Sequence, residues 1–176
     1  PGQWAVWDRL KQSTSATRNK AVTWFRQQAV AMSNVGPAQM WAQNRENLVP
    51  NIQRGNMYMF YYNPKLKDRL PYYDKFPLVI PLEKYGNGFL GINFHYLPPK
   101  IRVALLNRIR DKNMTYRTLK NHKYIKHTIK RYLNNHVKSR FVTVYPEEWN
   151  IAVFLPTERF AKASKASVYA DSIGKY

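Results

Sequence analysis

The sequence contains no cysteine, and it also lacks long apolar runs. A protein without thiols has no disulfide framework, no cysteine-based zinc or iron–sulfur site and no catalytic thiolate. No apolar stretch approaches the roughly 18 residues that a membrane span needs, and none resembles the hydrophobic part of a signal peptide. We therefore predict a soluble protein with no membrane contact and no export signal.

Motifs typical of catalysis and of metal or cofactor binding are missing as well. There is no glycine-rich phosphate loop, and His122 and His127 are five residues apart rather than the four of a helical metal-binding pair. Glu83 and Lys84 faintly resemble the acid-and-lysine clusters of metal-dependent nucleases, but they are adjacent and lack the acid–x–lysine spacing. We predict that the protein is not an enzyme and binds no cofactor and no metal.

Acidic residues are scarce where basic residues are dense. Residues 101–140 hold twelve of the 29 Lys and Arg residues and a single acid, Asp111, and so carry +11 of the formal net charge of +19. Charge concentrated in this way repels itself unless a polyanion or an acidic partner offsets it. Clustered Lys and Arg in a chain of pI about 10.2 are typical of nucleic-acid binding.

The aromatic content and an apolar fraction of 44% indicate a folded core rather than a basic tail. Aromatic and β-branched runs predict strands at Met57–Tyr62, Leu78–Leu82, Phe89–Tyr96, Phe141–Tyr145 and Ile151–Leu155. Six prolines between Pro64 and Pro99 favour short, bent strands. We predict an α+β fold: a small, bent, antiparallel barrel-like sheet with packed helices and an N-terminal helical arm.

Helical patterns flank these strands. One helix is predicted from Pro98-Pro99 to about Asp111, a long basic helix over residues 116–138, and a last helix from Glu158, capped near Thr157, to about Ile173. Two N-terminal helices would build the arm. We predict a subunit-docking arm of residues 1–55 and an α+β core domain of residues 56–176. The arm's apolar anchors for a partner would be Trp4, Trp7, Trp24 and Trp41.

The basic helix is the strongest functional signal. Ordinary solvated helices mix Glu with Lys, whereas residues 116–138 contain no acid. We interpret the helix as a phosphate-binding surface; the alternatives are a solvated face and an acidic protein partner. Predicted DNA contacts are Arg102, Arg108, Arg110, Lys120, Lys123, Lys126, Lys130, Arg131, Lys138 and Arg140. Because lysine outnumbers arginine on the helix, we expect backbone contacts with weak sequence specificity.

Aromatic residues interleaved with charge allow a second binding mode. The candidates that could stack the bases of a single strand are Tyr58, Phe60, Tyr61, Tyr62, Tyr72 and Tyr73. Alternating aromatic residues also fill small β cores, and we favour this simpler interpretation.

Four segments occur in one order that is found in a known family. They are GNMYMFYYNPKLKDRLPYYDKFPLVIPLEKYGNGFLGINFHYLPP (Gly55–Pro99), IKRYLNNHVKSRF (Ile129–Phe141), PEEWNIAVFLPTERF (Pro146–Phe160) and VYADSIGKY (Val168–Tyr176). These segments resemble virion-associated proteins of T4-like tailed phages, of the DNA end protector type. Residues 1–50 lie outside the resemblance.

The resemblance implies a non-enzymatic protein of the virion head–neck region that binds packaged double-stranded DNA at its end and shields it from exonucleases. It implies DNA and virion proteins such as portal or neck subunits as partners, an oligomeric state imposed by the particle, and presence in the host cytoplasm during assembly. The alternative is a purely structural connector (a neck, head-completion or baseplate component) whose basic surface packs on acidic subunits. An RNA-binding module of ribosomal type is supported by charge alone.

Overall fold

The structure, a computed structural model, describes residues 48–112, 121, 125–154 and 157–174 and confirms the α+β class. The strands are β1 (Leu48–Val49), β2 (Met57–Met59), β3 (Tyr73–Asp74), β4 (Leu78–Tyr85), β5 (Gly88–Asn93), β6 (Ile129–Leu133), β7 (Phe141–Val144) and β8 (Phe160–Ala161). The helices are α4 (Pro99–Lys112), α6 (Trp149–Phe154) and α7 (Lys165–Gly174), with 3-10 turns η1 (Phe94–Tyr96), η2 (Ile125–His127), η3 (Asn134–His136) and η4 (Pro146–Glu148).

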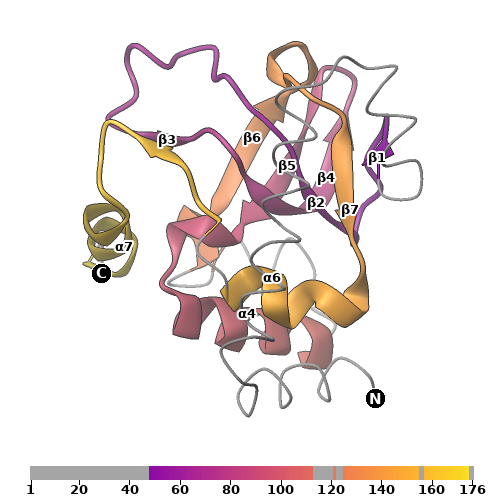
Figure 1. Ribbon diagram of the computed structural model, residues 1–176, viewed down its shortest axis with the longest axis vertical. Coiled ribbons are helices and arrows are strands. Elements are labelled where there is room, and N and C mark those ends of the chain that lie inside the picture. The colour runs from indigo at the N-terminus through magenta and orange to yellow at the C-terminus, as the bar shows by residue number, and fades with distance from the viewer. Residues whose placement is uncertain (1–47, 113–120, 122–124, 155–156, 175–176) are drawn as a thin grey trace, which may run out of the picture.

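Six strands form one antiparallel sheet in the order β1-β7-β2-β4-β5-β6, and β3 pairs with β8 in a separate ribbon beside α7 (Figure 1). The sheet is open, with β1 and β6 at its edges, and the predicted barrel-like shape is not confirmed. The connection from β6 to β7 folds back over the continuation of β2, where Tyr62 and Val137 form a bridge. This connection brings two distant parts of the chain to one end of the sheet.

The two faces of the sheet bury different side chains. The aliphatic residues of one face pack against α4 and α6, and both helices lie below the sheet in Figure 1. The other face holds an aromatic cluster of Tyr58, Phe60, Tyr62, Phe89, Tyr132 and Phe141. Phe60 meets Tyr132 edge to face at 5.3 Å, a geometry that adds about 0.5–1.5 kcal/mol beyond burial. The interpretation of Tyr58, Phe60 and Tyr62 as core residues is therefore confirmed.

Residues 125–137, predicted as part of the long basic helix, instead form η2, β6 and η3, so that prediction is wrong for this segment. β6 pairs with all residues from Gly88 to Ile92 of β5, and Tyr132 stacks on Phe89 in the aromatic cluster (5.3 Å between centroids). The strand is favoured because it satisfies the backbone groups along the edge of β5 and buries Tyr132, whereas a helix would satisfy only its own backbone groups.

Two other segments also differ from the predictions. Residues 149–154 form α6 instead of a strand, because Trp149, Ala152 and Val153 recur at helical spacing and pack in the larger core. The last helix begins at Lys165 instead of near Thr157, because the Ser164 hydroxyl accepts a hydrogen bond from the Ser167 N–H and caps the first turn.

The N-terminal arm falls mostly outside the described residues. Its two predicted helices and Trp4, Trp7, Trp24 and Trp41 cannot be placed there. The last residues of the predicted arm contribute to the folded core, since Leu48 is buried and pairs with Val142, and Ile52 packs on the aromatic cluster. The division at residue 55 stays a prediction.

Gly88 is required by the approach of β6 to β5. A Cβ atom at Gly88 would lie 2.0 Å from the backbone oxygen of Tyr132, whereas one at Gly86 in the same hairpin turn meets nothing within 4 Å. We expect Gly88→Ala to lower the free energy of unfolding by about 1–3 kcal/mol through overpacking, and Gly86→Ala to change it by less than about 0.5 kcal/mol. Urea unfolding of both variants measures the difference, and equal stability would contradict the close approach.

Candidate nucleic-acid interface

Three segments lie at the end of the sheet away from α4 and α6, and the one that follows β2 extends from there toward β3 and β8 (Figure 1). They are residues 63–70 after β2, residues 83–88 around the β4–β5 turn, and residues 131–140 between β6 and β7. Backbone hydrogen bonds hold them side by side: the Asn63 N–H donates to the His136 carbonyl (3.0 Å) and the Asn134 N–H to the Asn87 carbonyl (2.9 Å). We call this region the loop end.

The loop end is strongly basic. Its acids are Asp68 and Glu83, and Glu83 accepts a hydrogen bond from the Tyr85 hydroxyl (3.0 Å). Its cations are Lys65, Lys67, Arg69, Lys84, Arg131, Lys138 and Arg140. Six of these seven side chains are exposed and Arg140 is half-buried. Positive charge gathered on protruding loops creates an attractive potential for a polyanion.

The loop end combines predicted and missed cations. Arg131, Lys138 and Arg140 were predicted as DNA contacts from the sequence, and the fold of β6 and its connection brings them there. Lys65, Lys67, Arg69 and Lys84 were missed, because they are far from residues 101–140 in sequence and their local excess of charge is small. A signal for three of them exists in KLKDR, a polar run between Pro64 and Pro71 that is typical of an exposed loop.

The other predicted cations lie elsewhere. Arg108 and Arg110 are on α4, at the opposite end of the sheet, and Lys126 precedes β6. The Arg110 guanidinium stacks over Trp149 (4.7 Å) and donates to the Asn150 side chain (2.9 Å), which fixes α4 against α6. Lys130 on the edge strand β6 lies over the Tyr96 ring (4.2 Å), and edge-strand charges also discourage pairing with other chains. Lys120 and Lys123 fall outside the described residues.

Arg102 is corrected from a predicted phosphate contact to a buried structural residue. Its side chain is fully buried and donates to the carbonyls of Leu97, His95 and Val153. It also donates to the Glu158 carboxylate (3.2 Å) and the Tyr169 hydroxyl (2.8 Å). A guanidinium enclosed in this way joins α4 to the C-terminal segment and does not reach a phosphate.

A second buried polar group surrounds Asp74. Its carboxylate accepts hydrogen bonds from the Asn93 amide (3.0 Å) and from the Phe76 and Arg159 N–H groups, and it contacts His95 Nδ1 at 2.6 Å. Burial raises the pKa of Asp74, but the charge and hydrogen bond of His95 and the other donors outweigh burial, so the net pKa lies below its ordinary value.

His95 Nε2 in turn lies 2.8 Å from the Thr157 hydroxyl. This order of carboxylate, imidazole and hydroxyl also occurs in hydrolases. Here the His95 side chain is fully buried and Asp74 nearly so, which leaves no approach for a substrate to the imidazole. The arrangement joins β3, the end of β5 and the segment before β8.

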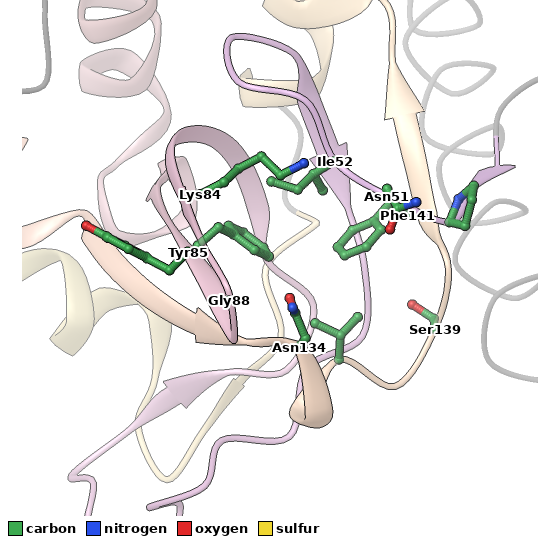
Figure 2. Close-up of a pocket in the computed structure, with 11 residues that line it drawn as sticks. Asn51, Ile52, Lys84, Tyr85, Gly88, Asn134, Ser139 and Phe141 are labelled. Atoms are coloured by element: carbon green, nitrogen blue, oxygen red, sulfur yellow. The ribbon is translucent and has the colours of Figure 1, made fainter.

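A pocket of about 300 Å³ opens at the loop end on the side of the aromatic cluster. Its lining includes Asn51, Ile52, Lys84, Asn134, Ser139 and Phe141. Figure 2 shows the Lys84 side chain extending from the hairpin toward Ile52 and the Asn134 amide directed into the same space, while Tyr85 points away. The pocket therefore joins an apolar wall to amide, hydroxyl and ammonium groups.

A different depression lies beside α4. It is an apolar groove of about 330 Å³, lined by residues including Leu97, Ile101, Leu105, Ile125 and Ile173.

Across the part of the chain that the structure describes, no helix is long and apolar enough to cross a membrane. Within that same part, no group of three or more His, Asp or Glu side chains is arranged to hold a metal ion.

Comparison with known protein families identifies a match over nearly the whole chain. The family model described as phage T4 terminal DNA protecting protein matches residues 3–173, nearly the whole chain. No curated protein and no solved structure matches this chain. The match confirms the resemblance drawn from the four sequence segments, extends it into the N-terminal arm, and describes a role in protecting DNA rather than a reaction. The chain belongs to the family of phage T4 terminal DNA protecting proteins.

Proposed function

We propose that this protein binds the end of packaged double-stranded DNA through the loop end, without sequence specificity, and shields the terminus by occupying it. The observation that carries the proposal is the concentration of exposed cations on one end of the sheet in a member of a terminal DNA protecting family. Protection by occupancy requires tight binding to the sugar–phosphate backbone and no catalytic group.

The side chains of the loop end suit backbone contacts. Lys65, Lys67 and Lys138 carry ammonium groups on long exposed stems, which neutralise phosphates without reading bases. Arg131 is less suited to base recognition, because its guanidinium lies over the Tyr85 ring (4.5 Å) and donates to the Asn87 side chain (2.8 Å). Weak sequence preference follows from this composition.

The proposed location is the head–neck region of the virion, where a packaged DNA end would lie, with the protein in the host cytoplasm during assembly. Docking there would use the N-terminal arm and its tryptophans on portal or neck subunits.

The second candidate function is a structural connector in which the same cations face an acidic virion protein. The same cluster of exposed cations at the loop end supports this candidate as well as DNA binding. Both functions predict binding that depends on salt, so DNA binding must be tested directly.

The test is competition by DNA that differs in its number of ends. A labelled linear duplex is bound at several salt concentrations, and unlabelled plasmid competes as a closed circle, as one linear molecule or as several fragments of the same total mass. If about six phosphates are neutralised, we expect a log–log salt slope near −5. End recognition predicts that competition grows with the number of ends at constant mass.

Two results would overturn the proposal. Competition that depends on mass alone would leave general DNA binding and remove end recognition. No binding at low salt would remove DNA as the ligand of the loop end and favour the structural connector. Protection of the linear duplex from an exonuclease at the same protein concentrations provides the matching functional measurement.

A further inference from the structure

The pocket at the loop end has the composition of a site for one nucleotide. Its wall is formed by Ile52 and Phe141, and behind these lies the aromatic cluster, in which Phe89 and Phe141 are 6.1 Å apart. Asn51 and Asn134 supply amide donors and acceptors, and Lys84 supplies positive charge. Among the described residues that line the pocket there is no acid, so an anionic ligand meets no like charge.

The pocket is built from fixed backbone. Ser139 accepts a hydrogen bond from the Tyr61 N–H (2.8 Å) and donates to the Arg140 carbonyl, which holds the connection before β7 in place. On the opposite side, the Asn134 N–H is bonded to Asn87 in the hairpin turn. A preformed site requires little ordering of the protein when a ligand enters.

The volume selects the kind of ligand. About 300 Å³ is at the lower limit of ligand pockets, which span about 300–1,000 Å³, so one nucleotide fits and a base pair does not. A base inside a duplex would have to leave the stack at a cost of a few kcal/mol. A terminal base has a stacking neighbour on one side only, and its entry costs less.

We propose that this pocket receives the terminal nucleotide of a DNA strand, with its base against Ile52 and Phe141 and its phosphate near Lys84. This inference rests on the proposed function and deepens it, because it explains how a surface of non-specific cations distinguishes an end from the middle of a duplex. The loop-end cations would provide affinity, and the pocket would provide the preference for ends.

The first measurement needs no variant. A duplex carries 2-aminopurine, a fluorescent base sensitive to stacking, either at its terminal position or near its centre, and each is titrated with the full chain. Entry of the terminal base predicts a fluorescence change for the end-labelled duplex and none for the centre-labelled one. Binding without a change at the terminal position, or with equal changes at both positions, would overturn the inference.

The second measurement blocks the pocket without changing its charge. Asn51→Met together with Asn134→Met removes both amides and fills the space with flexible apolar side chains. The matched control is Gln53→Met with Asn135→Met, since both residues are exposed neighbours outside the lining. We expect the pocket variant to lose a factor of about 5–100 in its preference for linear over closed-circular DNA, the range for one base stacked on aromatic groups. Affinity for closed circles should stay within about twofold, because the phosphate contacts remain.

The outcomes separate this inference from the proposed function. A wild-type protein that shows no preference for ends contradicts the proposed function itself. A wild-type protein that prefers ends, with a folded pocket variant that keeps the full preference, contradicts the pocket alone. Loss of the preference in the control variant as well would also contradict the pocket, because the effect would not depend on its lining.

Discussion

Replacing Lys65, Lys67 and Lys138 together by alanine is expected to weaken binding to duplex DNA about 100-fold near physiological salt. All three side chains are exposed at the loop end, and each phosphate contact in B-DNA releases about 0.9 counterion, so three lost contacts reduce the log–log salt slope by about 2.7. Fluorescence anisotropy of a labelled duplex at several salt concentrations measures both quantities. The fold should be unaffected, since exposed lysines contribute little to stability.

The matched control removes the same charge from the other end of the sheet. Lys100, Arg108 and Lys126 are exposed there, and Arg108 and Lys126 were themselves predicted as DNA contacts from the sequence. We expect their joint replacement by alanine to weaken binding less than about fivefold, because charges more than a Debye length from the DNA are largely screened. Equal losses in the two variants would contradict a localised interface and indicate binding governed by net charge.

Replacing Arg102 by leucine is expected to lower the free energy of unfolding by about 3–5 kcal/mol, because it removes the buried cation that pairs with the buried Glu158 carboxylate. The control is Lys165→Ala, which removes an exposed cation near Glu158, at 3.8 Å and 59% exposed. We expect the control to change stability by less than about 0.5 kcal/mol. Urea unfolding at neutral pH measures both, and similar losses would contradict the dominant role of Arg102.

The pH dependence of the same pair has a definite sign. Burial, the largest single influence, raises the pKa of Glu158, but the charges of Arg102 and His95 and the hydrogen bonds to the carboxylate together outweigh it, so the net pKa is lowered from its ordinary value of 4.5. The pair therefore stabilises the wild type above pH 4.5, and this stability is lost as the pH falls through the lower folded-state pKa. In Arg102→Leu burial dominates, the pKa is expected to rise, and the variant should become more stable on acidification from neutral pH toward 4.5. A loss of stability over that range would contradict this account.

The sequence predicted the strands well where their pattern was local. Leu78–Leu82 lies within β4 and Phe141–Tyr145 includes β7, because runs of β-branched and aromatic residues favour strands, although the similar run that begins at Ile151 belongs to the helix α6. The start of α4 at Pro99 was also readable, since proline suits the first turn of a helix. The burial of Tyr58, Phe60 and Tyr62 followed from the same alternation.

Segments whose spacing allowed two structures were decided by tertiary contacts. Ile125, Ile129 and Tyr132 fit a helical face as well as a strand, and the unpaired edge of β5 selected the strand. The burial of Arg102 could not be predicted from the sequence either, because its carbonyl acceptors and Glu158 come from segments up to 56 residues away. A charge count cannot separate a phosphate contact from a cation enclosed in the core.

The sequence by itself determined the strongly basic character of this protein, its α+β class and its family, because charge, aromatic content and sequence segments are properties of the chain that folding does not alter. Only the tertiary structure decided where the basic surface lies. Turns and strand pairing bring Lys65, Lys84 and Lys138, which are distant in sequence, to one end of the sheet, where Lys84 lines a pocket. The physical reason is that the electrostatic field and the shape of a site depend on distances in space, and β pairing between remote segments sets those distances.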